Sequence, residues 1–417
     1  MFRGYAALAG QELFNTSRLI SHMRPTVPTI DGSVASMMSC ACHVRIPYDD
    51  SWTGLQAALG DGPYVITDAP WYNAARPESA EFAGIWLMSI DGMDGVPVQR
   101  DISESICAGG IAGRSRDTTR SLQFSALVVA CTNAGMEYGK DWLNCILRSS
   151  NVRSGVDMTY WKAHPEDTAA DPETLKRSMY GLVLTKSLTT SEVLGKGGGH
   201  QHRQASICRV EWEMVATQPY AYGDPLVTPV NWDSTITESI TWAHAPDCED
   251  SGSCDLPTIY NADCVPPNVV ISSAVVPTCG GCLPICSIER RTWELPTILS
   301  TCDEMVVTVR VTNDGTDPLN VNFYWRPCGS TEMCDRTNPL QIAGLEAGYT
   351  AVADSVTGRP YVEVSGVAHR QVGIVGTPTG APWKPITMDA VMCWELVAES
   401  TPGADFTVLV ELRDRDA

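Results

Sequence analysis

Hydrophobic and polar residues alternate along several short segments of the chain with a period of two. The clearest case lies within residues 206–215, where alternate positions are apolar: Cys208, Val210, Trp212 and Met214. The positions between them carry charged side chains: Arg209, Glu211 and Glu213. Because successive side chains of a β-strand point to opposite faces, this pattern predicts a strand with one buried face. Weaker alternation predicts strands over 85–90 and 122–128.

One segment of the first half has helical rather than strand periodicity. Within residues 136–147, Trp142, Cys145 and Ile146 fall at helical spacing. Thr132 or Asn133 stands just before this segment and can cap the first turn. We therefore expect one helix packed against the strands of a β-rich domain.

Strict alternation returns after residue 302. Four apolar positions share one face of the first strand: Met305, Val307, Val309 and Val311. The same pattern recurs over 321–325 and 406–412, and turn sequences such as Asn313-Asp314-Gly315 separate these segments. Short alternating strands at such intervals are typical of a β-sandwich or jelly roll.

Composition divides the chain between these two β-rich regions. Ten prolines and six cysteines fall between positions 219 and 301, and proline interrupts regular hydrogen-bonded elements. The 417 residues suffice for two or three domains. We predict a mainly β protein with an N-terminal β-rich domain and packed helix at 1–225, a cysteine- and proline-rich connector at 226–302, and a C-terminal β-sandwich or jelly-roll-like domain at 303–417.

Net charge and hydropathy exclude two classes of partner. The formal charge is −20, and an acidic chain repels nucleic acid because phosphate binding needs clustered Lys and Arg. The apolar runs are far shorter than the roughly 20 residues of a membrane span. The first residues lack a secretory apolar core. We expect a soluble protein made in the cytosol, without nucleic-acid recognition or a membrane span.

Sixteen cysteines are unusual for a chain without an export signal. Nine of them are candidates for disulfides or for zinc: Cys248, Cys254, Cys264, Cys279, Cys282, Cys286, Cys302, Cys328 and Cys334. The run 279–286 has the spacing closest to a zinc site, with a fourth ligand from Cys264 or Cys302, but it offers only one short-spaced pair. Disulfides within the connector are favoured, while zinc and free buried thiols remain alternatives. The pairs 248 with 254 and 328 with 334 could each close a short loop.

No segment carries a recognisable catalytic or nucleotide-binding motif. His200 and His202 follow three glycines, and a hairpin tip is favoured over a metal loop. Residues 90–95 are interpreted as a turn, not a calcium loop. Glu211 and Glu213 are interpreted as ordinary surface charge. We expect no catalytic residue and no cofactor, and we assign no metal site.

Three stretches of the first half resemble a known family. "RDISESICAGGIAGRSRDTTRSLQFSALVVACTNAGMEYGKDWLNCIL", residues 100–147, resembles the minor tail proteins of siphoviruses that infect mycobacteria and related actinobacteria. "MFRGYAALAGQELFNTSR", residues 1–18, is similar to the family's first strand and turn, and "VEWEMVATQPYAYGDP", residues 210–225, to the end of its N-terminal domain. In layout the chain is most similar to the distal tail protein of the tail tip. The similarity covers about the first 225 residues in order.

The resemblance implies a structural virion protein without enzymatic activity. Six copies would form a ring that joins the tail tube protein to other minor tail or tail-tip proteins, with the tape measure protein as a further possible partner. In that ring an N-terminal β-sandwich, residues 1–225, would lie inside, and a galectin-like or other β-sandwich domain, residues 303–417, would project outward. The protein would be assembled in the host cytoplasm and reside in the virion at the tail tip. Its cysteines would begin as thiols and oxidise after lysis. The cysteine-rich connector departs from a minimal distal tail protein, so a neighbouring tail-tip protein remains an alternative.

Within this family interpretation, three arginines are candidates for contacts between subunits: Arg114, Arg116 and Arg120. Guanidinium groups bind carboxylates through two hydrogen bonds, which suits an acidic neighbour. The alternative is a solvated arginine-rich loop. A second functional hypothesis is a receptor- or glycan-binding tail protein, in which Trp325, Trp383 and Trp394 stack on sugars, although core packing is the favoured interpretation of those side chains.

Overall fold

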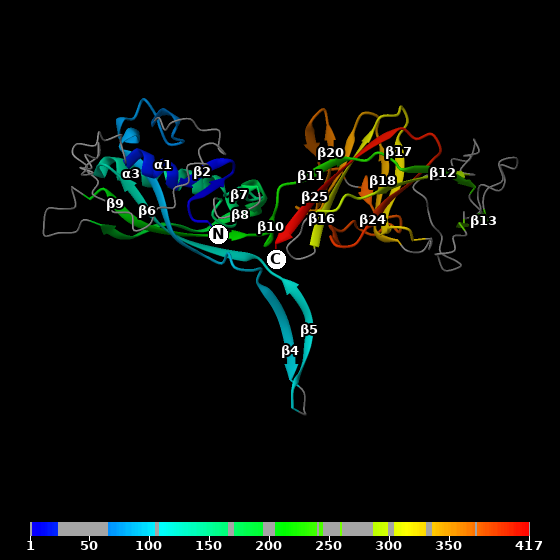
Figure 1. Cartoon of the computed structure of the whole chain (residues 1–417), viewed down its shortest axis with the longest axis horizontal. Helices are drawn as coiled ribbons and strands as arrows, with labels where there is room; N and C mark the ends of the chain where they lie inside the picture. Colours follow the sequence, from blue (N-terminus) through cyan, green and yellow to red (C-terminus); the bar gives the residue numbers. More distant parts are fainter. Residues whose placement is uncertain are drawn as a thin grey trace. The chain divides into compact units, whose positions relative to one another are not determined.

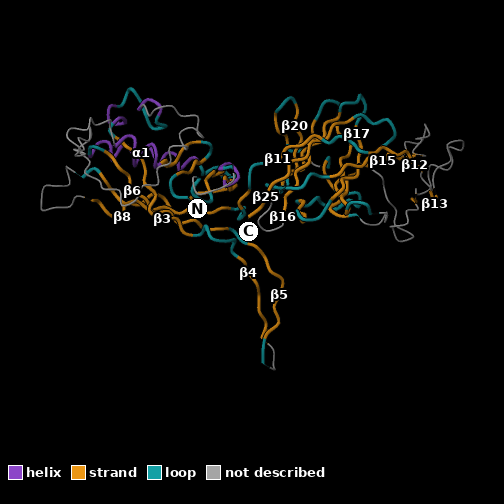
Figure 2. Tube along the Cα trace, in the orientation of Figure 1, coloured by secondary structure: helices purple, strands orange, loops and turns teal. Residues whose placement is uncertain are grey.

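Two compact units make up the chain. The computed structural model describes residues 2–23, 66–104, 108–165, 171–194, 205–239, 242–244, 259–260, 287–298, 304–330, 336–371 and 373–416. The first unit comprises Met1–Asp224 with Asp416–Ala417, and the second comprises Pro225–Arg415. Both are built mainly of β-strands (Figures 1 and 2), so the predicted mainly β fold is confirmed.

One antiparallel sheet organises the first unit. Its strands are β1 Tyr5–Leu8, β2 Gln11–Asn15, β3 Phe82–Asp91, β6 Arg120–Ala130, β7 Val156–Trp161, β8 Lys176–Leu194, β9 Ile207–Ala216 and β10 Ala221–Tyr222. Neighbouring strands pair in the order β2-β1-β7-β8-β9-β6-β3, and β10 pairs with the beginning of β8. A separate pair, β4 Val98–Glu104 and β5 Gly110–Asp117, leaves this sheet between β3 and β6.

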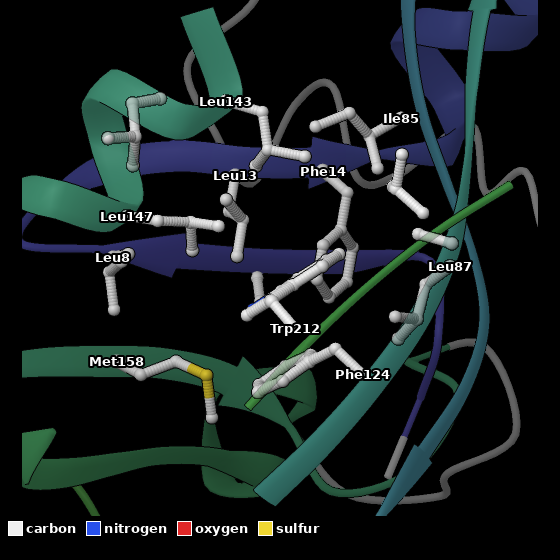
Figure 3. Close-up of a cluster of buried hydrophobic side chains, with 14 of the residues drawn as sticks. Leu8, Leu13, Phe14, Ile85, Leu87, Phe124, Leu143, Leu147, Met158 and Trp212 are labelled. Atoms are coloured by element: carbon white, nitrogen blue, oxygen red, sulfur yellow. The ribbon is translucent and has the colours of Figure 1, made fainter. Parts of the chain in front are cut away.

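Strand β9 shows how the alternating pattern becomes a core. Its four predicted inward residues are each at most 1% exposed. Trp212 on β9 lies opposite Phe124 on β6, and their rings stack with centroids 4.8 Å apart. Figure 3 shows this pair beneath Leu13, Leu143 and other apolar side chains. The predicted burial of this face is confirmed.

Helices complete the first unit. Those in the described residues are α1 Thr16–Met23, α3 Asn133–Ser149 and the short 3-10 turns Ile66–Asp68, Pro77–Ala80 and Pro172–Leu175. Helix α3 begins where the sequence predicted, because the Thr132 hydroxyl accepts a hydrogen bond from the Gly135 N–H at 3.0 Å. Ile146 is buried and Trp142 half-buried against the core, whereas Cys145 is exposed. The helix is thus confirmed, with its apolar face turned away from Cys145.

The second unit is a β-sandwich of two antiparallel sheets. One contains β11 Leu226–Pro229, β16 Glu304–Asn313, β19 Thr350–Asp354, β20 Arg359–Val364, β21 Val367–His369, β23 Ile386–Asp389 and β25 Phe406–Asp416. The other has the order β12-β15-β24-β17-β18-β22. Its strands are β12 Ser234–Ser239, β15 Ser287–Glu294, β17 Leu319–Pro327, β18 Thr337–Leu345, β22 Val375–Gly376 and β24 Trp394–Ser400. A small pair, β13 Trp242–His244 and β14 Ile259–Tyr260, stands apart.

Both sheets contribute to one apolar core. The alternating residues predicted to point inward on β16, β17 and β25 are buried in this core. Between the sheets, the ring centroids of Phe323 and Phe406 lie 6.3 Å apart. Trp325, Trp383 and Trp394 are also at most 9% exposed, which confirms core packing as their role. The galectin-like or jelly-roll-like assignment of this sandwich stays a prediction.

Much of the range 226–302, predicted as a connector, lies outside the described residues. The described parts include β11, β12 and β15, which pair into the two sheets of the sandwich. The cysteines at 248, 254, 264, 279, 282, 286 and 302 and the histidines at 200 and 202 all lie outside the described residues. Within the described ranges, no helix is both long enough and apolar enough to cross a membrane.

Gly139 tests the packing of α3 on the sheet. Glycine inside a helix normally costs stability relative to alanine, but a Cβ at Gly139 would lie 2.5 Å from the Phe82 ring. We expect Gly139→Ala to lower the free energy of unfolding of the first unit by about 1–3 kcal/mol through overpacking. The exposed Asp141→Ala on the same helix is the control. Denaturant unfolding followed by circular dichroism measures both, and a stabilising Gly139→Ala would contradict this packing.

Candidate functional site

The most distinctive surface of the first unit is the hairpin formed by β4 and β5, here called the arm (residues 98–117). Every residue of both strands is exposed. Figure 1 shows the two strands extending away from the sheet of the first unit. Three large apolar side chains remain in solvent: Val98 at 61%, Ile102 at 71% and Ile111 at 72% exposure. An isolated two-stranded hairpin is at best marginally stable in water, so the arm is a candidate contact surface.

Both faces of the arm present apolar groups. Ile102 pairs with Ala112, and the neighbouring Ser103 pairs with Ile111. Because successive pairs in a ladder project to opposite faces, Ile102 and Ile111 lie on opposite faces near the tip. A partner that covered one face alone would leave one isoleucine in water. The arm is therefore suited to lie between two partner surfaces, one against each face.

The base of the arm is fixed to the first unit by hydrogen bonds. The Thr118 N–H donates to the Pro97 carbonyl at 2.9 Å and closes the hairpin at its root. The Tyr220 hydroxyl donates to the Asp117 carboxylate. These contacts set the direction in which the arm leaves the sheet, while nothing in the described chain covers its length.

Arg120 is the central group of this base. Its guanidinium donates to the Gly92 carbonyl at 2.5 Å and to the Pro219 carbonyl at 3.2 Å. Burial lowers the pKa of the Arg120 guanidinium, and the side chain is 3% exposed. Gly92, with φ +91°, is required here, since a Cβ at that position would overlap the Ser121 carbonyl. The segments before and after the arm are thus joined through one cation.

The structure separates the three arginines that were predicted together. Arg114 and Arg116 lie on β5 and are exposed, as a contact role requires. The expectation that Arg120 is available to a neighbouring subunit is wrong, because this residue is in phase with the inward-facing Leu122 and Phe124 of β6. Arg120 is a structural residue at the base of the arm.

A shallow hollow of about 280 Å³ lies on the polar face of the first sheet. It is lined by residues of β3, β6, β8 and β9, including Glu211 and Glu213. The Glu213 carboxylate accepts a hydrogen bond from the Ser121 hydroxyl at 2.8 Å. The Arg209 Nε lies 3.8 Å from the Glu211 Oε1. Glu213 thus has its partner on the adjacent strand β6 and Glu211 has its partner on β9 itself, which agrees with their interpretation as surface charge.

The disulfide pairing of Cys328 differs from the sequence prediction. Cys328 forms a disulfide with Cys393, not with Cys334. The pairing of β17 with β24 sets Pro327 opposite Trp394, which brings the adjacent cysteines together across 65 residues of chain. Cys334 lies outside the described residues. Cys145 and Cys208 are free thiols, exposed and buried respectively.

Comparisons with known proteins give structural likenesses only. No protein-family model and no curated protein matches the chain. Among solved structures, the chain is similar to SPP1 Dit, which is described as a paradigm of the hub adsorption apparatus in phages infecting Gram-positive hosts. The two share 11% sequence identity and a TM-score of 0.41, and the match covers 82% of this chain and 96% of that chain. It is also similar to a chain of the phage p2 baseplate in its activated conformation, at 11% identity and a TM-score of 0.37 over 78% and 90% of the two chains. Both TM-scores lie below the level that establishes a common fold.

Arg120 and Arg116 allow a direct test of their different roles. Arg120→Ala leaves two carbonyl groups at the base of the arm without their donor, and we expect it to lower the free energy of unfolding by about 1–3 kcal/mol. Arg116→Ala, on the exposed arm, should change it by less than about 0.5 kcal/mol. Urea unfolding measures both values. Equal effects of the two substitutions would contradict the structural role of Arg120.

Proposed function

We propose that this chain is a structural protein of a long non-contractile phage tail. Specifically, it would be a hexameric distal tail hub that joins the tail tube to tail-tip or baseplate proteins. The observation that carries the proposal is the arm, whose two faces each expose an isoleucine that nothing within the described chain covers. The arm lies almost entirely within residues 100–147, the segment that resembles phage minor tail proteins.

A ring of identical subunits accounts for an arm with two uncovered faces. In a closed ring each subunit meets its neighbour through two different surfaces. The arm of one subunit can then be held between surfaces of adjacent subunits, so that Ile102 and Ile111 are both buried. The exposed Arg114 and Arg116 supply charge-assisted hydrogen bonds to carboxylates of a chain whose net charge is −20.

The remaining parts of the proposal follow from the same assignment. The partners are further copies of this chain, the tail tube protein, other minor tail or tail-tip proteins and, as a further possible partner, the tape measure protein. The location is the tail tip of the virion after assembly in the host cytoplasm. The role is structural and involves no catalysis. The glycan-binding alternative gains no support from Trp325, Trp383 or Trp394, which are buried in the core of the second unit.

Charged substitutions on the arm test the self-association. We expect the wild-type chain to form a hexamer and the double variant Ile102→Asp with Ile111→Asp to be monomeric, because each aspartate would be desolvated at the contact. Val391→Asp is the matched control, since Val391 in the second unit is 72% exposed and lies outside the arm. Size-exclusion chromatography with light scattering gives the masses, and circular dichroism checks folding.

Two results of this experiment would count against the proposal. A monomeric wild-type chain at micromolar concentration removes the basis for a ring. A hexamer that survives the double substitution shows that the arm does not hold the subunits together.

A further inference from the structure

Three side chains that can bind a metal lie close together in the second unit, at one end of the sheet with the order β12-β15-β24-β17-β18-β22. Glu294 ends β15, Cys328 follows β17 directly, and Cys393 directly precedes β24. These strands are neighbours in the order β15-β24-β17. The three residues are therefore brought together by strand pairing, although Glu294 and Cys393 are 99 residues apart in sequence.

The geometry places the three ligand atoms around one point. The Cys393 Sγ lies 3.5 Å from the Glu294 Oε1. One ligand atom from each residue, two sulfurs and one carboxylate oxygen, lies within 4.8 Å of the others. Glu294 and Cys393 are exposed and Cys328 is half-buried, so a hydrated ion and small reagents can reach the cluster.

Hydrogen bonds hold this frame independently of the disulfide. The Cys328 N–H donates to the Cys393 carbonyl at 3.0 Å, and the Leu295 N–H donates to the Trp394 carbonyl at 2.8 Å. The Trp394 indole N–H donates to the Asp389 carbonyl at 2.8 Å and fixes the turn before β24. Breaking the sulfur–sulfur bond removes none of these contacts, so the three ligands remain close in the reduced protein.

We propose that reduction of the Cys328–Cys393 disulfide creates a zinc site formed by Cys328, Cys393 and Glu294. A cellular dithiol supplies two electrons and two protons to the disulfide and itself becomes a disulfide, which leaves two thiols on this chain. Each thiol releases its proton to solvent as its sulfur binds Zn²⁺. The Glu294 carboxylate provides the third ligand and water the fourth.

The ligand set suits zinc better than a hard cation. Zinc accepts thiolate sulfur at about 2.3 Å and carboxylate oxygen at about 2.0–2.2 Å in a tetrahedron, whereas Ca²⁺ and Mg²⁺ prefer oxygen ligands alone. Two sulfurs on one tetrahedral zinc are about 3.8 Å apart. The two Cα atoms lie 5.3 Å apart, and rotation of the cysteine side chains suffices to separate the sulfurs this far. Without a metal, Glu294 would oppose the thiolates by charge repulsion, and zinc reverses that effect.

The site would keep one end of the sandwich cross-linked in two redox environments. Zinc would connect β15, β24 and β17 in a reducing cytoplasm, and the disulfide would connect the last two in oxidising surroundings. This inference does not depend on the proposed tail function, because it concerns only the chemistry of three side chains in the second unit.

Site-resolved alkylation tests the proposal in the wild-type chain despite its many other cysteines. The protein is reduced with a phosphine, freed of metal by a chelator, and then treated with iodoacetamide in the presence of Zn²⁺, Mg²⁺ or no metal. Peptide mass spectrometry follows the modification of Cys328 and Cys393 separately. We expect Zn²⁺ to slow alkylation of both residues at least about tenfold and Mg²⁺ to have no effect.

A matched pair of variants assigns the third ligand. Glu294→Gln should raise the zinc concentration needed for protection at least about tenfold, since even residues that only support metal ligands are worth that much. Glu346→Gln, at an exposed turn of the same unit, should leave it unchanged. Circular dichroism of the reduced protein, with and without zinc, monitors the fold.

Three outcomes would overturn the site. The first is alkylation of Cys328 and Cys393 at the same rate with and without zinc. The second is full protection in Glu294→Gln, which removes the carboxylate from the ligand set. The third is loss of the second unit's β structure on reduction whether or not zinc is present, because the proposal requires a site preserved by strand pairing.

Discussion

A pair of β-strands that leaves its sheet has no face hidden from water, and the arm of the first unit is such a pair. Its strands satisfy each other's backbone groups, but they bury none of their side chains. The cost of exposing Val98, Ile102 and Ile111 is recovered only if another surface covers them. This constraint makes the arm the feature on which any account of assembly depends.

Outside the arm, each unit has a buried apolar core of its own. In the first unit the sheet and α3 pack around a core that contains the stacked Phe124 and Trp212. In the second unit two sheets enclose Trp325, Trp383 and Trp394, the candidates for sugar stacking. Arg120 belongs to the stable part, since it ties the base of the arm to two backbone carbonyls. Because its base is fixed and its strands are exposed, the arm is suited to be positioned by its own subunit and bound by another molecule.

Strict alternation made the core strands predictable, and its absence hid the arm. The apolar face of β9 could be predicted because a strand with one buried face repeats every two residues. The arm buries neither face, so its sequence carries no such repeat and resembles a solvated loop. The buried position of Arg120 did carry a signal, because it is in phase with Leu122 and Phe124, but a charged residue on an apolar face is easily assigned to the surface.

Long-range chemistry was less accessible from the sequence than the local elements. The Cys328–Cys393 disulfide follows from the pairing of β17 with β24, which no local spacing encodes, and the shorter loop to Cys334 was the natural but incorrect choice. The proximity of Glu294 to this disulfide depends on the same sheet order. Neighbouring strands therefore determine which chemical groups meet, while the sequence reveals mainly which face of each strand is buried.

Electron microscopy of the purified chain tests the central claim most directly. The account predicts closed rings of six copies in which both faces of every arm are covered by neighbouring subunits. Single particles without rotational symmetry, or rings whose arms remain in solvent, would contradict it.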